Sequence, residues 1–161
     1  MISQQELQQL FQYRDGNLYW NVLRPRIRTG NKAGCVNHTT GYEMIGIDGK
    51  IYRTHRLVFL MLNGYLPKEI DHINGIKTDN RIENLREVTH SQNCYNIKKR
   101  TNNTSGVMNV SWHKPYSKWT VRIRVNGKPK NFGYFDDLEL AQLVAIEAKD
   151  KYHKEFANHG H

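Results

Sequence analysis

Apolar and polar residues alternate strictly from residue 119 to residue 125, which predicts a strand with one buried and one basic face. Asn126-Gly127 follows directly and is typical of a two-residue hairpin turn, so residues 128–135 are expected to form the returning strand. With residues 106–114 as the first strand, the pattern predicts a three-stranded sheet. The next apolar positions recur at helical spacing and predict one helix packed on that sheet: Leu138, Ala141, Ala145, Ala148 and Tyr152.

Shorter elements are predicted in the first hundred residues. A capping box opens an expected helix over residues 3–12. Asp15-Gly16 and Asp48-Gly49 each lie between short runs of strand-forming residues, so two hairpins are expected. The apolar run 56–63, RLVFLMLN, ends at Gly64 and predicts a buried helix.

A polar stretch separates these two patterns. The segment KKRTNNTSG, which follows Ile97, contains no apolar residue and is rich in Asn, Thr and Ser. It predicts two domains, 1–98 and 106–161, joined by a linker over 99–105. A long surface loop inside one domain is the alternative.

The charge balance indicates a polyanionic partner. The 161 residues carry 24 Lys and Arg against 15 Asp and Glu, a net charge of +9. Nucleic acid is the commonest partner of such a chain, although a solvated basic surface gives the same balance. Residues 106–135 hold six basic and no acidic residues, whereas residues 136–155 hold six acidic and three basic ones. We therefore expect the sheet, and not the helix, to meet the anion.

Cysteine usage and the N-terminus favour a cytoplasmic location. Cys35 and Cys94 are far apart and form no C-x-x-C motif, so neither a structural zinc site nor a disulfide framework is indicated. We expect them to be buried or incidental thiols. No signal peptide is recognisable, and no apolar run is long enough to cross a bilayer, so no membrane partner is expected.

One Asp-His pair is followed by an unusual set of asparagines. Asp71-His72 precedes Asn74, Asn80, Asn84, Asn93 and Asn96. Carboxylate and amide oxygens suit a hard divalent metal, and a histidine can activate water. Successive strand residues point to opposite faces, however, so Asp71 and His72 could share a site only at a strand end or through local distortion. The dipeptide alone favours a structural role.

The same stretch resembles the HNH endonuclease motif in its Asn-rich, phage and homing-type form. The matching runs are D-H-I-N-G at 71–75, N-R-I-E-N-L at 80–85 and Q-N-x-x-N at 92–96, with H-R-L-V at 55–58 ahead of them. The resemblance implies a finger of two short strands and a helix that clasps one divalent metal. It also implies metal-dependent cleavage that leaves 5′-phosphate and 3′-hydroxyl ends.

The resemblance implies roles for individual residues. His72 would be the general base, Asp71 and Asn93 would bind the metal, and Asn84 would fix the loop of the finger. Asn80 and Asn96 are expected in supporting roles. For His55, a phosphate contact and a packing role both remain open. Mg²⁺ is the expected metal and Mn²⁺ an alternative. A zinc-binding cysteine pair and a His or Asp at position 93 are both absent, so the chain resembles the zinc-free branch of the family that uses an Asn ligand.

Residues 106–157 resemble a second family, the AP2-type DNA-binding domain. The matching runs are G-V-x-x-V-S-W, K-W-x-V-x-I-x-V-N-G-K and F-G-Y-F-D, followed by an Ala-rich helix. The resemblance implies a sheet that lies in the major groove, with Arg122 and Arg124 directed at DNA. Phosphate contacts are expected from four lysines: Lys114, Lys118, Lys128 and Lys130.

These expectations combine into an α+β protein of two modules. The function they predict is a metal-dependent endonuclease acting on double-stranded DNA as a monomer. A DNA-binding regulator with a decayed nuclease module is the main alternative, and a nuclease for RNA or branched DNA is a third.

Overall fold

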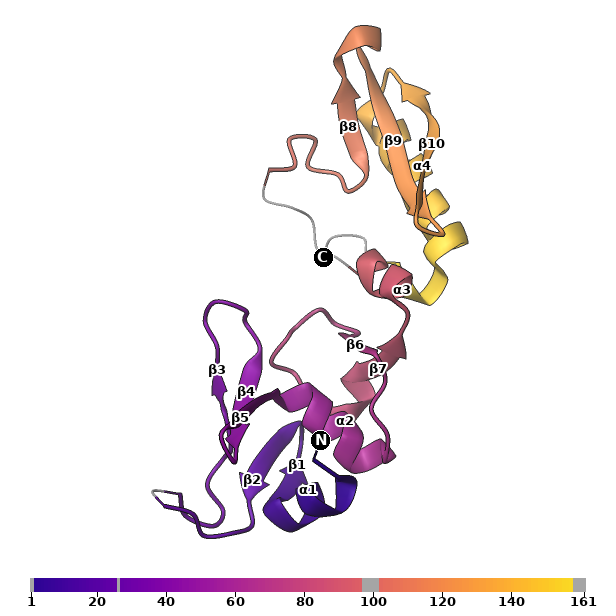
Figure 1. The fold of residues 1–161 in the computed structure, drawn as a ribbon. Coiled ribbons are helices and arrows are strands. Elements are labelled where there is room, and N and C mark those ends of the chain that lie inside the picture. The colour runs from indigo at the N-terminus through magenta and orange to yellow at the C-terminus, as the bar shows by residue number, and fades with distance from the viewer. Residues whose placement is uncertain (1, 26, 97–101, 158–161) are drawn as a thin grey trace. The chain divides into compact units, whose positions relative to one another are not determined.

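The computed structural model describes residues 2–25, 27–96 and 102–157, and the chain divides into two compact units, Met1–Val88 and Thr89–His161 (Figure 1). Each unit has its own hydrophobic core and is described by itself. Both units mix helices with small antiparallel sheets, so the expected α+β class is confirmed.

The first unit contains three small antiparallel sheets, with strand orders β1-β2, β3-β4-β5 and β6-β7. Its elements are α1 (Gln4–Leu10), β1 (Phe11–Arg14), β2 (Asn17–Trp20), β3 (Cys35–Val36), β4 (Glu43–Ile47), β5 (Lys50–Arg53), α2 (Thr54–Asn63), β6 (Glu69–His72), the 3-10 turn η1 (Ile82–Asn84) and β7 (Leu85–Val88).

The helices and hairpins expected in this unit are present, but the first helix ends earlier than predicted, because residues 11 and 12 belong to β1. Helix α1 begins at the predicted capping box, in which the Ser3 and Glu6 side chains each bond the other residue's backbone N–H. Helix α2 starts two residues before the predicted run and ends at Gly64, whose φ of 79° suits glycine at this C-terminal position. The two-residue strand β3 was not predicted.

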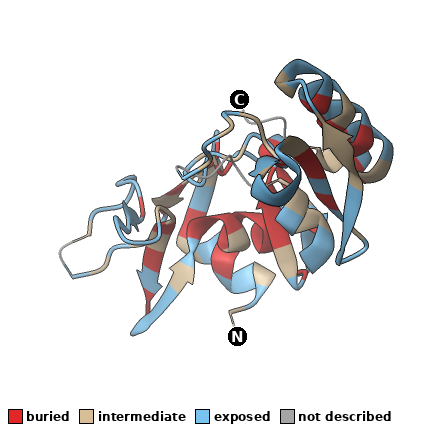
Figure 2. Cartoon of the chain, turned by 90° about the horizontal axis from the view of Figure 1, so that it is seen from above, coloured by how far each residue is buried: buried red, intermediate tan, exposed pale blue. Residues whose placement is uncertain are grey.

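The core of the first unit gathers around α2. This helix buries most of its length, as the apolar run over residues 57–62 predicts, and buried positions are red in Figure 2. Residues from the surrounding helix and strands complete the core: Leu7, Phe11, Leu18, Trp20, Ile45, Ile47, Ile70 and Leu85. Strand β6 thereby anchors its apolar residue in the core directly before the Asp71-His72 pair.

The second unit is a three-stranded sheet packed on one helix. The sheet has the order β10-β9-β8, and α4 packs mainly against β9. The elements are α3 (His90–Tyr95), β8 (Val110–His113), η2 (Lys114–Tyr116), β9 (Lys118–Val125), β10 (Lys128–Phe135), α4 (Leu138–His153) and η3 (Lys154–Phe156). The predicted strands and helix are therefore all present.

Helix α3 is grouped with this second unit. The Tyr95 ring stacks on His153 with centroids 3.8 Å apart, and the Tyr95 hydroxyl accepts a hydrogen bond from the Asn126 backbone N–H at 3.2 Å. The compact units therefore divide after Val88, before the predicted boundary. Residues 97–101 lie outside the described part of the chain, so the predicted linker over 99–105 stays a prediction.

Cys35 and Cys94 are both exposed. Of the two alternatives expected from the sequence, buried thiols are therefore wrong, and the cysteines are incidental thiols on the surface. No helix in the described ranges has the length and hydrophobicity needed to cross a bilayer.

Candidate functional site

Strands β6 and β7 set Asp71 opposite Arg86. The two residues are direct partners in the antiparallel register, so their side chains lie on the same face. Asp71 is only 7% exposed, and the Arg86 Nε and Nη2 groups donate to its Oδ2 at 3.0 and 2.8 Å. A buried carboxylate is thus balanced by a charge-assisted hydrogen-bonded pair.

His72 is the last residue of β6 and enters a cluster of aromatic rings. It pairs with Leu85 in the register, so its side chain leaves the strand on the face opposite to Asp71. The His55 ring lies edge-on to it with centroids 4.9 Å apart, and the Tyr42 ring lies 5.2 Å from His55 and 6.1 Å from His72. We call these three side chains the ring cluster.

The buried amide of Asn80 contacts His72 directly. Asn80 is 2% exposed, and its Oδ1 lies 3.2 Å from His72 Nε2. Its Nδ2 donates to Glu43 Oε2 at 3.1 Å, and the other oxygen of Glu43 pairs with Lys32 Nζ at 2.8 Å. A continuous line of polar contacts therefore runs from the surface to the imidazole.

Burial sets the charge state of both histidines in the ring cluster. It lowers the pKa of His72, while the hydrogen bond with Asn80 and the charge of Asp71 act in the opposite direction. Burial also lowers the pKa of His55 to about 3, with a further contribution from the nearby charge of His72. Both rings are therefore neutral near pH 7, and a neutral imidazole can take a proton from water.

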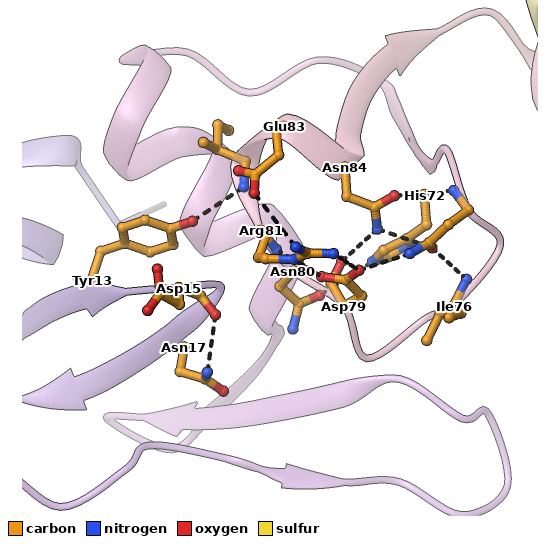
Figure 3. Close-up of polar contacts among 12 residues, drawn as sticks. Tyr13, Asp15, Asn17, His72, Ile76, Asp79, Asn80, Arg81, Glu83 and Asn84 are labelled. Atoms are coloured by element: carbon orange, nitrogen blue, oxygen red, sulfur yellow. Dashed lines mark hydrogen bonds and ion pairs between the residues drawn. The ribbon is translucent and has the colours of Figure 1, made fainter.

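Asn84 fixes the loop between the two strands. Its Oδ1 accepts from the Asn74 backbone N–H at 3.0 Å, and its Nδ2 donates to the Asn74 side chain at 3.0 Å and to the Asp79 backbone oxygen at 2.7 Å. Figure 3 shows these contacts beside His72 and the paired Asp79 and Arg81. The predicted loop-fixing position of Asn84 agrees with this geometry.

The N-terminal hairpin supports the segment that carries Asn80. The Tyr13 hydroxyl accepts from the Ile82 backbone N–H at 3.1 Å (Figure 3). In the adjoining turn, Gly16 has a φ of +80°, and a Cβ built there would lie 2.6 Å from Arg81 N and 2.9 Å from the carbonyl carbon of Asn80. Only a glycine allows the two backbones to approach this closely.

The other two predicted asparagines lie in the second unit. Asn93 is on α3, whose first turn is held by a capping box between Thr89 and Gln92. Asn96 is the residue that ends this helix. Asp71 belongs to the first unit, so the pairing of Asp71 and Asn93 at one metal ion stays a prediction.

The donor chemistry of the predicted metal ligands fits Mg²⁺. This ion prefers hard oxygen ligands and keeps several waters, so one carboxylate and one amide oxygen are a reasonable protein contribution. Within the described ranges, no group of three His, Cys, Asp or Glu side chains is arranged to hold a metal. A metal ion at Asp71 would share this carboxylate with Arg86.

The sheet of the second unit presents basic residues on two different faces. Arg122 and Arg124 are exposed and alternate with the buried Val121 and Ile123, so they lie on the face away from α4. Lys118 lies on that same open face by alternation, and its Nζ pairs with Asp136 at 2.9 Å. The Arg122 and Arg124 placement agrees with the expected basic outer face.

The remaining predicted lysines are placed differently. In the register, Lys130 pairs with Ile123 and Lys128 with Val125, so both lie on the face toward α4. The Lys130 ammonium accordingly donates to the Tyr152 hydroxyl at 3.1 Å. Lys114 is exposed on the short turn η2.

Sequence reasoning missed Arg86, Glu43 and Tyr42. Arg86 could have been found from the sequence, because antiparallel pairing of the two strands places one residue of the run LREV opposite Asp71, and this run contains a basic residue. Glu43 carries no local signal, since it meets Asn80 across 37 positions of sequence. Its role depends on tertiary packing alone.

Comparison with known proteins places these features in a family. A family model described as HNH endonuclease matches residues 52–95. Protein 3.8 of Escherichia phage T7 is 34% identical over 110 residues, which cover 67% of this chain and 90% of that protein. The chain therefore carries an HNH endonuclease domain at residues 52–95 and is a relative of Protein 3.8. No solved structure gives a significant match.

The matched HNH region runs from β5 through α2, β6 and β7 to α3. It therefore contains His55, Asp71, His72 and Asn84. Glu43 and Lys32 lie outside this region, as does the sheet of the second unit.

Proposed function

We propose that the protein is a metal-dependent endonuclease that hydrolyses phosphodiester bonds in double-stranded DNA. The observation that carries the proposal is the buried Asp71-His72 pair at the end of β6, with a neutral His72 imidazole, inside an HNH domain. Protein 3.8, which is similar over 67% of this chain, comes from a phage, and this supports a phage origin for the protein.

His72 acts on the attacking water. Its unprotonated ring nitrogen takes a proton from water, and the oxygen forms a bond to phosphorus while the bond from phosphorus to the 3′ oxygen breaks. The 3′ oxygen leaves with a proton from solvent, which gives 5′-phosphate and 3′-hydroxyl ends. Mg²⁺ or Mn²⁺ held by Asp71 and Asn93 would stabilise the negative charge that develops on the phosphate.

The second unit holds the duplex in this proposal. Its open face carries Arg122 and Arg124, which can reach base edges or phosphates, and this agrees with the resemblance to AP2-type domains. The excess of basic residues over the whole chain favours the same partner. We propose that one chain with a single site cuts as a monomer.

Cleavage of supercoiled plasmid tests the proposal. Purified full-length protein is incubated with Mg²⁺, with Mn²⁺ or with EDTA, beside His72→Ala and Asn93→Ala. We expect open or linear DNA only with metal, and a loss of about 10²-fold or more in both variants, because each removes a group that acts in the reaction. His38→Ala and Asn63→Ala are matched controls, since both change exposed side chains of the first unit.

Duplex binding in EDTA, measured by fluorescence anisotropy, separates loss of chemistry from loss of substrate. Retained binding by His72→Ala and Asn93→Ala is expected, because Arg122 and Arg124 are unchanged. A wild-type protein that binds duplex but cuts nothing with either metal would overturn the proposal and favour a DNA-binding regulator. Preferential cutting of RNA or branched DNA would change the substrate class.

A further inference from the structure

We propose that Glu43 is a positioning residue that fixes the tautomer of His72 through the Asn80 amide. The inference rests on the proposed role of His72 as general base. It assigns a role to a buried carboxylate that lies outside the matched HNH region, nine residues before its first position. Three consecutive contacts carry it, from Lys32 to Glu43, from Glu43 to Asn80 and from Asn80 to His72.

The orientation of the Asn80 amide follows from what Glu43 can do. An ionised carboxylate only accepts hydrogen bonds, so the group of Asn80 that faces Glu43 must be the NH₂. The amide oxygen then faces the other way, toward His72 Nε2 at 3.2 Å. Asn80 is 2% exposed, so water does not compete for either end of this amide.

The Asn80 oxygen in turn determines the tautomer of His72. An amide oxygen cannot donate, so the hydrogen of the neutral imidazole must be on Nε2. The lone pair is then on Nδ1, which is the nitrogen that can take a proton from water. The opposite tautomer would set two acceptors, Nε2 and the amide oxygen, against each other in a buried site.

Lys32 supports the acceptor-only state of Glu43. Glu43 is 5% exposed, and a buried carboxylate is costly unless it is paired. The Lys32 ammonium lies 2.8 Å from Oε1, while Oε2 receives the Asn80 hydrogen bond. Each oxygen of Glu43 therefore has a donor, and a proton on the carboxylate is not needed.

NMR of the full-length protein without metal tests the tautomer directly. Long-range ¹H–¹⁵N correlation spectra distinguish a protonated from an unprotonated ring nitrogen in each histidine, and His72→Gln assigns the signals of His72. We expect wild-type His72 to be Nε2-protonated. In Glu43→Gln, the new amide can accept or donate, so the constraint on Asn80 is lost and both tautomers should appear.

Plasmid cleavage by the same variants gives the functional readout. Glu43→Gln should lower kcat about 10- to 100-fold with little change in KM, which is the usual effect of losing a group that orients a reacting side chain. Glu83→Gln is the matched control, because Glu83 is an exposed carboxylate of the same unit outside these contacts. It should behave as wild type in both measurements.

A reciprocal exchange provides a rescue. Asn80→Asp alone places two carboxylates together in a buried site and should lower activity and stability. In the double variant Asn80→Asp/Glu43→Gln, the carboxylate at position 80 faces His72 Nε2 and can only accept its hydrogen bond. The new amide at position 43 donates a hydrogen bond to the same carboxylate. Recovery of the Nε2-protonated signal and of kcat above either single variant is expected, and simple damage to the fold would not produce it.

Two results would overturn the inference. One is the observation that His72 of the wild-type protein is protonated on Nδ1. This measurement does not depend on whether any variant folds. The other is Glu43→Gln with an unchanged tautomer and unchanged kcat. Because the spectra require no cleavage, an inactive wild-type protein would refute the proposed function while the tautomer result still stands by itself.

Discussion

The His55 imidazole is 3% exposed, and its Nδ1 has no hydrogen-bond partner within the described ranges. Its neighbours in the ring cluster are the rings of Tyr42 and His72. A protonated ring at this position would be a desolvated charge beside a second imidazole. The position therefore favours a neutral side chain that packs against His72, which is one of the two roles left open by the sequence.

His55 should make the stability of the first unit depend on pH. Its pKa is about 3 in the folded chain against 6.5 ordinarily, so between these values the unfolded chain binds more protons. Stability is therefore complete above pH 6.5 and is lost as the pH falls toward 3. From pH 7 to pH 5 this residue should remove about 2 kcal/mol of unfolding free energy.

Hydrogen exchange of α2 amides at pH 7 and pH 5, corrected for intrinsic rates, measures this loss. His55→Phe keeps an aromatic ring without a titrating group. Between the two pH values, the opening free energy of α2 in this variant should therefore fall by about 2 kcal/mol less than in the wild type. His72 contributes in the same direction and remains in the variant, so a smaller pH dependence should persist. Identical losses in wild type and His55→Phe would contradict the prediction.

At the scale of elements, local sequence signals located α1, α2, α4 and the hairpins at the two Asp-Gly turns and the Asn-Gly turn, whereas β6, β7 and α3 were expected only from the resemblance to the HNH motif. A capping box, a two-residue turn and a terminal glycine depend on a few neighbouring residues, so they can be recognised without tertiary information. Strand β3 is only two residues long and gives no such signal. The association of α3 with the second unit depends on Tyr95 meeting His153, a contact across 58 positions that no periodicity reports.

In the candidate site, too, residues with a local sequence signal could be predicted and residues that depend on tertiary contacts could not. The spacing of Asp71, His72 and Asn84 was enough to identify the HNH motif. The partners of these residues were not predictable, because Arg86 and Glu43 reach the site through strand pairing and packing. The facing of Lys128 and Lys130 was predictable in principle: a two-residue turn at Asn126-Gly127 fixes the register, and that register puts them toward α4.

The turn at Gly16 should be a sensitive point of the first unit. Gly16→Ala forces a positive φ on alanine and drives its Cβ against the backbone at residues 80 and 81, so we expect a loss of about 2–5 kcal/mol in stability. Asn80 should shift as well, so cleavage should fall even below the unfolding temperature. Urea unfolding and plasmid cleavage measure the two effects.

Gly49 supplies the matched control for this substitution. It has nearly the same φ, +77° against +80°, in a second Asp-Gly turn, but a Cβ there meets nothing within 4 Å. Gly49→Ala should therefore cost only the backbone strain, about 1 kcal/mol, with normal cleavage. Equal effects of the two substitutions would show that the contact with residues 80 and 81 is unimportant.

For the molecule as a whole, a net charge of +9 would attract DNA to many parts of its surface. A specific binding face requires that some basic residues matter more than others. The sheet of the second unit offers a direct comparison, because Arg122 and Lys130 are on neighbouring strands but on opposite faces. Both are exposed, and each contributes one positive charge.

Arg122→Ala and Lys130→Ala therefore test whether the open face binds the duplex. Arg122→Ala should weaken binding about 10-fold and reduce the slope of log K against log salt by about 1, since one charge leaves the interface. Lys130→Ala should change affinity less than about 2-fold, because its ammonium is bonded to Tyr152 on the helix side. Anisotropy of a labelled duplex in EDTA over a series of KCl concentrations measures both quantities. Equal losses in the two variants would indicate attraction by diffuse charge, whereas a larger loss in Lys130→Ala would place the duplex on the side of α4.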